Sequence, residues 1–235
     1  GSPRAPGGSP GLTAGAGLPV TSATEGIPIT ENVQAFTAGD LSATVNNFTA
    51  TVDWGDGTGI QNGRVVFDSN GNFHVEGTHT YAKPGSDVVL VSIKDTAFGG
   101  GTVNTGVGPI TVATGTITDP GVPVNGVEGS SLDNVLVETF SYSVPTATPS
   151  DFAASIDWGD GSASSPSAGT VIETSATATQ SNFAIVGSHN YAQPGSYTIT
   201  TTIQDLTALP TVTTVTDTTT ATVAAVGLQF TAAPV

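Results

Sequence analysis

Hydrophobic and polar residues alternate along several short stretches of the chain. In residues 48–54, Phe, Ala, Val and Trp occupy every second position, and two Thr and one Asp lie between them. Residues 152–158 repeat this arrangement with Phe, Ala, Ile and Trp on the apolar side. A period of two with one apolar side is typical of a strand that buries one face. Both stretches are therefore predicted to be half-buried β-strands.

Further strands are predicted where β-branched residues follow a turn. Val88–Lys94 and Tyr197–Ile203 each follow a Pro-Gly turn, and Asp68–Asn72, which contains Asn-Gly, has the composition of a hairpin turn. The other expected strands are 64–67, 73–76, 102–112 and 212–223. No stretch shows a sustained 3.6-residue period with helix caps. Strands that recur roughly every 8–12 residues indicate an all-β protein made of antiparallel β-sandwiches.

The chain also repeats itself. Phe48–Thr58 recurs as Phe152–Ser162, which lies 104 positions later. Gly77–Gly85 recurs as Gly187–Gly195, now 110 positions later, so the second copy carries six additional residues around Ala163–Ser181. Self-similarity at this spacing predicts two tandem modules of about a hundred residues each.

The segments around the two copies predict where the modules begin and end. Residues 17–20 (Gly-Leu-Pro-Val) precede the first Glu-Gly pair, 121–124 (Gly-Val-Pro-Val) precede the second, and 227–235 resemble a third such segment that stops before its Glu-Gly. The predicted organisation is a linker or artificial lead-in at 1–23, a first repeat at 24–115, a linker at 116–126, a second repeat at 127–224, and the lead-in to a further repeat at 225–235.

Composition narrows the classes of partner. The 235 residues contain 19 Asp and Glu against 4 Lys and Arg, a formal net charge of -15, and residues 119–235 contain no Lys or Arg at all. Nucleic acids and anionic membranes require a basic surface and are unlikely partners. The absence of cysteine excludes disulfides, thiolate metal sites and cysteine nucleophiles. A chain rich in Thr, Ser and Gly but poor in Lys is typical of bacterial secreted or cell-surface proteins, which is where we expect it.

Three motifs in fixed order resemble a known family. Each repeat carries Trp-Gly-Asp-Gly, then His-x-Tyr-x-x-Pro-Gly, then a Val, Ile and Thr strand that ends in Asp. This order resembles the PKD (polycystic kidney disease) domain over Thr24–Val112 and Val127–Val223. The chain departs from the usual family motif because Asp53-Trp54-Gly55 replaces its Phe-Gly portion. The resemblance implies two immunoglobulin-like sandwiches and says little about function, because such modules occur in many parent proteins.

The Asp-Gly pairs of the motifs are predicted to form tight turns. Glycine tolerates a positive φ angle, and the Asp side chain can accept hydrogen bonds from the backbone just after it, at Asp56-Gly57 and at Asp160-Gly161. An alternative is that Asp53 and Asp56 form half of a cation site. Turn chemistry accounts for every residue of the motif and is favoured.

The aromatic residues of the motifs are predicted to be structural. Trp54 and Trp158 fall on the apolar side of their strands, which favours a place in the core over a platform for sugar stacking. His79 and His189 are expected to be structural histidines, hydrogen-bonded near Tyr81 and Tyr191. No Ser-Gly elbow, paired His or His-Glu-x-x-His accompanies them, so we expect no enzyme activity from this chain.

One metal hypothesis remains. If the strands of each repeat run alternately up and down, Glu25 and Asp95 meet at one pole of the first repeat, and Glu128 and Asp205 meet at one pole of the second. Asp119 of the linker would join the second pair. Carboxylates are the ligands that Ca²⁺ prefers, and calcium would stiffen the joint. The alternative is that these acids are solvated surface residues. Calcium is the only cofactor the sequence suggests.

These observations predict non-catalytic structural modules of a large bacterial secreted or cell-surface protein. The modules would project or assemble other domains, as in a fibre or an adhesin stalk, with neighbouring repeats of the same chain as partners. The alternative is a binding module that recognises a surface polysaccharide or a partner protein, or that self-associates, through an exposed sheet face. The longer Ala163–Ser181 segment is its best candidate surface.

Overall fold

The structure is a computed structural model that describes residues 11–17, 22–69, 71–97, 101–207 and 212–227. The chain divides into two compact units, Gly1–Thr114 and Gly115–Val235, each described separately below. The described residues form β-strands and two short 3₁₀ turns, η1 (Val45–Asn47) and η2 (Pro149–Asp151). The prediction of two all-β sandwich modules is confirmed. Parts of the predicted lead-ins (1–10 and 228–235) and Asn70 of the Asn-Gly turn lie outside the described residues.

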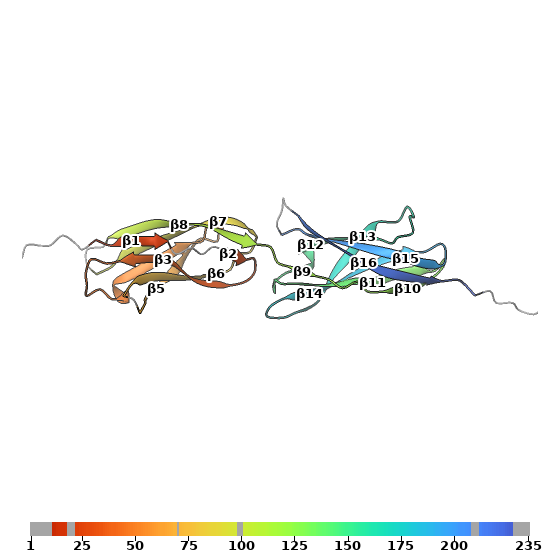
Figure 1. The fold of residues 1–235 in the computed structure, drawn as a ribbon, viewed down its shortest axis with the longest axis horizontal. Coiled ribbons are helices and arrows are strands. Elements are labelled where there is room, and N and C mark those ends of the chain that lie inside the picture. The colour runs from red at the N-terminus through yellow and green to blue at the C-terminus, as the bar shows by residue number, and fades with distance from the viewer. Residues whose placement is uncertain (1–10, 18–21, 70, 98–100, 208–211, 228–235) are drawn as a thin grey trace, which may run out of the picture. The chain divides into compact units, whose positions relative to one another are not determined.

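The first unit is a sandwich whose two layers are joined by one strand (Figure 1). Its hydrogen-bonded order is β1-β3-β6-β5-β4-β7-β8-β2. Within β5, residues 60–63 pair with β4, whereas residues 64–67 pair with β6, so this strand passes from one layer to the other. The strands are β1 (Thr13–Gly17), β2 (Ser22–Thr24), β3 (Ile29–Thr37), β4 (Phe48–Asp53), β5 (Ile60–Phe67), β6 (Phe73–His79), β7 (Gly85–Asp95) and β8 (Thr102–Ala113).

The second unit repeats this path. Its order is β10-β16-β15-β12-β13-β14-β11-β9, and β13 passes between the layers as β5 does. Of the six additional residues, two lie in the turn between β12 and β13 and four lengthen the hairpin formed by β13 and β14. The strands are β9 (Ile117–Thr118), β10 (Val124–Val127), β11 (Ser131–Tyr142), β12 (Phe152–Asp157), β13 (Ser167–Ala176), β14 (Ser181–Asn190), β15 (Gly195–Asp205) and β16 (Thr213–Ala224).

The first segment of each unit contributes a strand to both layers. β1 and β9 pair antiparallel with β3 and β11, respectively, and the chain then crosses to the other layer. There β2 and β10 pair parallel with the last strands, β8 and β16. Residues 13–17 and 117–118, which precede the motif-bearing strands, are therefore structured parts of the two sandwiches. We call residues 119–123, between β9 and β10, the crossover segment of the second unit.

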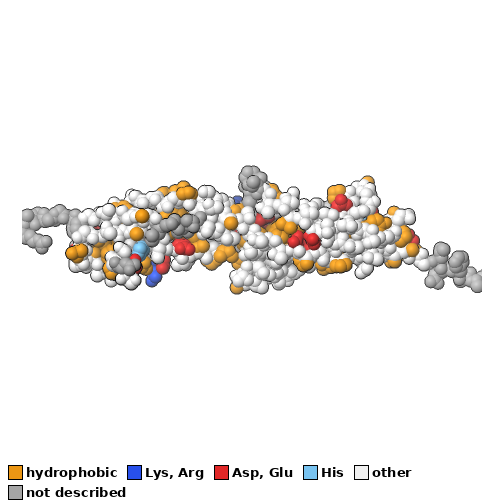
Figure 2. All heavy atoms as spheres, in the orientation of Figure 1, with side chains coloured by type: hydrophobic (Ala, Val, Ile, Leu, Met, Phe, Trp, Pro, Cys, Tyr) orange, Lys and Arg blue, Asp and Glu red, His pale blue; other side chains and the backbone are white. Residues whose placement is uncertain are grey.

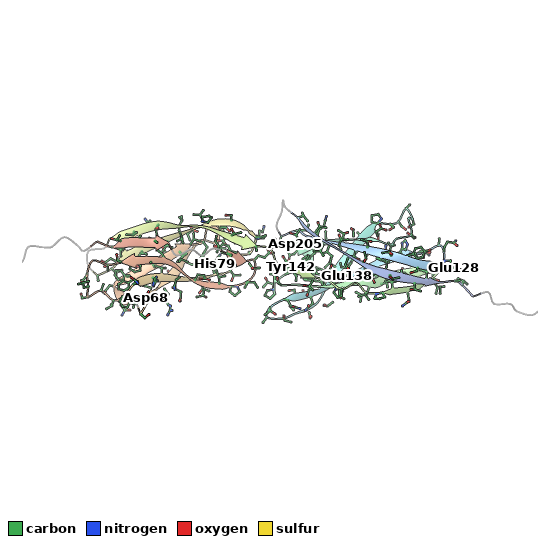
Figure 3. All side chains as sticks on the ribbon, in the orientation of Figure 1. Asp68, His79, Glu128, Glu138, Tyr142 and Asp205 are labelled. Carbon is green, nitrogen blue, oxygen red and sulfur yellow. The ribbon has the colours of Figure 1, made fainter. Side chains whose placement is uncertain are left out.

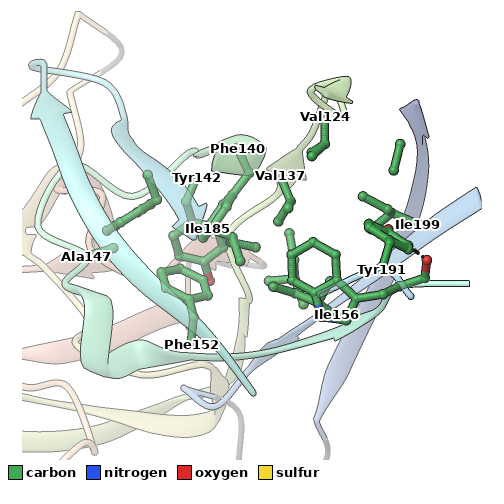
Figure 4. Packing of buried hydrophobic residues seen from close by; sticks show 14 of the residues in the cluster. Val124, Val137, Phe140, Tyr142, Ala147, Phe152, Ile156, Ile185, Tyr191 and Ile199 are labelled. Carbon is green, nitrogen blue, oxygen red and sulfur yellow. Dashed lines mark hydrogen bonds between the residues drawn. The ribbon is translucent and has the colours of Figure 1, made fainter. Parts of the chain in front are cut away.

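Each unit has its own hydrophobic core, and a tryptophan lies at the centre of each. Trp54 and Trp158 are fully buried, on the same apolar face as Phe48 and Phe152. Figure 4 shows the aromatic and aliphatic side chains of both layers of the second unit meeting in its core. The opposite strand carries glycine where the indole ring approaches. A Cβ atom built on Gly77 would lie 2.7 Å from Trp54 Cζ2.

Because the cores are separate, we expect Trp54→Ala to unfold the first unit and to spare the second. Truncating a buried ring of this size costs about 3–5 kcal/mol of unfolding free energy, which is much of the stability of a small domain. Trp158 is then the only tryptophan left, so its fluorescence reports the second unit alone. We expect the fluorescence melt, which reports the second unit, to be unchanged, and the ellipticity at 25 °C to be much smaller than in the wild type because the first unit is unfolded. Trp158→Ala should give the mirror result, and a shift of the remaining tryptophan's melt would refute independent cores.

Candidate functional sites

The motif residues of each repeat form one compact cluster. The ring of His79 stacks on Trp54 with centroids 5.0 Å apart and an interplanar angle of 9°. Its Nε2 lies 2.8 Å from Asp56 Oδ2, and the Tyr81 hydroxyl donates to the Trp54 carbonyl at 3.1 Å. Asp56 Oδ1 also accepts the backbone N–H and the hydroxyl of Thr58. The histidine is thus bonded to the aspartate of the Trp-Gly-Asp-Gly turn.

The second repeat reproduces the cluster. His189 stacks on Trp158 at 4.9 Å and 7°, and its Nε2 lies 2.9 Å from Asp160 Oδ2. The Tyr191 hydroxyl donates to the Trp158 carbonyl at 2.9 Å. The glycine after each motif aspartate, Gly161 here, has a positive φ, 67° in this unit. Both clusters fix the turn between β4 or β12 and the next strand against the core.

Electrostatics in the clusters favour the ionised aspartates. Burial alone would raise the pKa of Asp56, but the hydrogen bonds from Thr58 and His79 outweigh burial and lower this pKa below its ordinary value. Burial would likewise raise the pKa of Asp160, but hydrogen bonds from Ser162 and His189 outweigh burial and lower it. The hydrogen bonds from the histidines and from the residues after each aspartate hold the two motif turns, which is a structural role.

The first acidic pair proposed as a calcium site is not brought together. Glu25 follows β2, which runs parallel to β8, and its backbone N–H donates to the carbonyl of Ala113 at the end of β8. Asp95 ends β7, and the adjacent Lys94 pairs with Thr102 at the start of β8. The two acids therefore lie at opposite ends of a twelve-residue strand. The expected meeting at one pole was wrong, because the strand before Glu25 runs parallel to the last strand.

The second pair is separated in the same way. Glu128 lies beside the end of β16, where its backbone N–H donates to the Ala224 carbonyl and its Oε1 accepts the Val226 N–H. Asp205 lies beside the start of β16 and accepts the Tyr142 hydroxyl at 2.7 Å. Figure 3 shows Glu128 and Asp205 at opposite ends of the unit, with Glu138 between them. In the described part of the chain, no three Asp, Glu or His side chains form a group that could hold a metal ion.

A different set of acids does come together, beneath the crossover segment. Glu138 of β11 is fully buried, and neither of its carboxylate oxygens has a hydrogen-bond partner. Burial, together with the charges of Asp217 and Asp119, raises the pKa of Glu138 to about 7, and the backbone N–H of Thr139 offsets only part of this rise. Burial and Asp217 also raise the pKa of Asp119. The sequence contained a signal that was missed, because Glu138 stands between two core residues, Val137 and Phe140, on an otherwise apolar face.

An apolar groove of about 320 Å³ lies on the outer face of the first unit. Ile60 and Leu90, 71% and 50% exposed, form its apolar walls, and Asp53 and Asn104 provide polar groups. The face drawn in Figure 2 is mostly uncharged, with acidic and hydrophobic groups in small separate patches. In the longer hairpin of the second unit, the last five residues of β13 are exposed, including Ile172 at 45%, whereas most of β14 is buried.

No protein-family model and no curated protein matches the chain. Among solved structures, the chain is similar to extracellular cadherin domains 1–5 of protocadherin gamma B2, with 14% identity and a TM-score of 0.34 over 95% of this chain and 41% of that one. It is similar to an endo-fucoidan hydrolase of glycoside hydrolase family 107 at 12% identity and a TM-score of 0.36, covering 95% of this chain and 30% of that one. A Dpr2 and DIP-Theta immunoglobulin-domain structure is similar at 14% identity and a TM-score of 0.29, covering 92% and 99%.

The chain spans less than half the length of the first two of these structures. Likeness at such low identities and TM-scores carries no argument about function. The helices in the described part of the chain include none that is long and apolar enough to cross a membrane.

The lowered pKa of Asp160 predicts how the second unit responds to acid. A depressed folded-state pKa contributes stability above the unfolded pKa of about 3.8, and that stability is lost as the pH falls through the folded value. We expect Asp160→Asn to cost about 1–3 kcal/mol of unfolding free energy at pH 7, because it weakens hydrogen bonds to a largely buried carboxylate. The variant's stability should also fall less steeply between pH 5 and pH 3.

The measurement is urea unfolding followed by fluorescence at several pH values, in a Trp54→Phe background so that Trp158 reports alone. Glu173→Gln, which changes an exposed acid in the same unit, is the matched control and should leave the curve unchanged. An equal loss of stability for Asp160→Asn at pH 3 and pH 7 would contradict the role of the ionised aspartate.

Proposed function

We propose that the chain is a pair of non-catalytic spacer modules of a bacterial secreted or cell-surface protein, which hold other domains apart and transmit tension between them. The observation that carries this proposal is the parallel pairing of the second strand of each unit with its last strand. β2 pairs with β8 over three residues, and β10 pairs with β16 from Val124–Ala221 to Val127–Ala224.

Parallel pairing of these strands decides how a unit meets a pulling force. Tension enters through the strand near the start of the unit and leaves through the last strand, so the two paired strands are drawn in opposite directions along their length. Their hydrogen bonds are then sheared and must break together rather than one after another. The Glu25 and Glu128 N–H groups extend both ladders by one further bond, at 3.1 and 2.9 Å.

Other features of each unit support this role. β5 and β13 belong to both layers, so the layers are joined by covalent chain as well as by their core. The histidine–aspartate clusters fix the motif turns by hydrogen bonds, in a chain that has no cysteine. The acidic, lysine-poor composition supports an extracellular setting, and the duplication itself fits a protein that gains length by adding modules.

A binding role is the second candidate, and the apolar groove of the first unit favours it. Its exposed Leu90 and Ile60, with Asp53 and Asn104 beside them, could contact a polysaccharide or a partner protein. The equivalent of Leu90 in the second repeat is Thr200, which belongs to a threonine-rich face. A difference in groove-lining residues between the modules is consistent with a ligand-specific surface as well as with drift in a spacer.

The spacer proposal predicts high mechanical resistance when the chain is pulled from its ends. Single-molecule force spectroscopy should show two unfolding events, each releasing roughly 30 nm of chain at about 3.4 Å per extended residue. Because the chain has no cysteine, the pair S196C and T222C gives a second, defined attachment. These residues are cross-strand partners at the open end of the β15–β16 hairpin. Pulling on them opens the ladder one pair at a time and should require a lower force. Equal or lower force from the ends would refute the proposal.

The binding candidate makes a separate prediction. If the groove binds a polysaccharide, Leu90→Asp should abolish retention of the protein on immobilised polysaccharide. Val127→Asp changes an exposed hydrophobic residue of the second unit, 43% exposed, and is the matched control. A plain spacer shows no retention before either substitution and sediments as a monomer at high concentration.

A further inference from the structure

In each unit, a buried side chain faces the segment that crosses between the layers, and the chemical group at this equivalent position differs between the two units. In the first unit, Gln34 of β3 is fully buried, and its Nε2 donates to the Gly15 carbonyl at 2.9 Å and, more weakly, to the Ala16 carbonyl at 3.4 Å. The same nitrogen donates to the Ala35 carbonyl at 2.7 Å. A side-chain amide therefore ties β1 to the sandwich through donated hydrogen bonds.

The second unit has a carboxyl group where the first has this amide. Glu138 lies 104 positions after Gln34, the offset of the repeat, and each residue adjoins a register shift in its strand. Gly17 pairs with Gln34, and Gly121 of the crossover segment bridges to Glu138. Glu138 thus faces the crossing chain as Gln34 does, but an ionised carboxylate has no hydrogen to donate.

The surroundings of Glu138 are unfavourable for a negative charge. The charges of Asp119 in the crossover segment and of Asp217 on β16 both act on it, and a Cβ atom built on Gly121, its bridge partner, would lie 2.8 Å from Asp217 Oδ2. Asp119 Oδ2 is likewise buried without a partner. Ile185 is the residue opposite on β14. Residues 119–235 contain no Lys or Arg, and His189, the unit's one histidine, is bonded to Asp160. No Lys or Arg of the second unit neutralises the site, and the Thr139 backbone N–H alone favours a carboxylate there over burial and the two neighbouring charges.

We propose that Glu138 is a proton-operated latch for the crossover segment of the second unit. When protonated, its carboxyl group donates a hydrogen bond to the crossing backbone, as Gln34 does in the first unit. When ionised, it can donate none and repels Asp119 and Asp217, so the crossover segment and the adjoining β10 loosen. This inference rests on the packing within the unit and does not depend on the proposed spacer role.

The direction of the pH effect follows from linkage. A raised folded-state pKa gives stability that is fully present below the unfolded pKa and is lost as the pH rises through the folded value, here about 7. With that midpoint, the equilibrium constant for opening the crossover should rise about tenfold between pH 6 and pH 8. The first unit, with Gln34, should show no such change at residues 13–17.

The test is hydrogen–deuterium exchange of the full chain with EDTA present, read by mass spectrometry and corrected for the intrinsic pH dependence of exchange. Peptides that cover residues 116–127 should lose protection about tenfold between pH 6 and pH 8, and those of β1 should not. Glu138→Gln installs the residue of the first unit and should keep the crossover protected at both pH values. Asp217→Thr copies Thr105, the equivalent residue of β8, and should move the midpoint to lower pH.

Two outcomes would overturn the latch. Unchanged pH dependence in Glu138→Gln would show that another group titrates, provided that circular dichroism shows the variant folded. Restoration of full protection at pH 8 by millimolar Ca²⁺, in the wild type but not in Glu138→Gln, would show that a metal cation and not a proton neutralises these acids. A pH-dependent loss of protection in β1 of the first unit would equally contradict an assignment to Glu138.

Discussion

The fold of each unit depends on the burial of one indole ring. Trp54 and Trp158 can lie at the centre of their sandwiches only because the facing strand carries glycine, at Gly77 and Gly187, where any side chain would meet the ring. A histidine then stacks on the indole, and the aspartate of the following turn holds that histidine by a hydrogen bond. The buried indole ring thereby positions both the motif turn and the facing strand of the other layer.

Much of this arrangement could be predicted from the sequence, since local patterns encode it. The alternation around Trp54 specified a strand and its buried face, and the duplicated motifs specified two modules of the same fold. The partner of His79 was less accessible. Sequence placed the histidine near Tyr81, and the structure shows it within 4.6 Å of that ring but hydrogen-bonded to Asp56, 23 positions earlier. Contacts of that kind depend on how strands are paired, which spacing alone does not give.

The acidic residues show where sequence reasoning fails in physical terms. Pairing Glu25 with Asp95 required a simple up-and-down strand order, whereas β2 runs parallel to β8 and carries Glu25 to the other end. Glu138 was overlooked for a related reason. Its neighbours Asp119 and Asp217 lie 19 positions before it and 79 after it, and only the crossing of the chain between layers brings the three acids together. Comparison of the two repeats would have drawn attention to it, because Gln34 occupies the same position.

The continuous strand order of each unit has a consequence for how molecules meet. Because β5 and β13 join the layers, the strand order of the described residues in each unit ends on both sides in strands of one short segment: β1 and β2 in the first unit, β9 and β10 in the second. Cleavage or displacement of that segment uncovers β3 with β8, or β11 with β16, at the same time. Two open edges on one body are a template for donor-strand exchange, in which the displaced segment of one molecule completes the sandwich of the next.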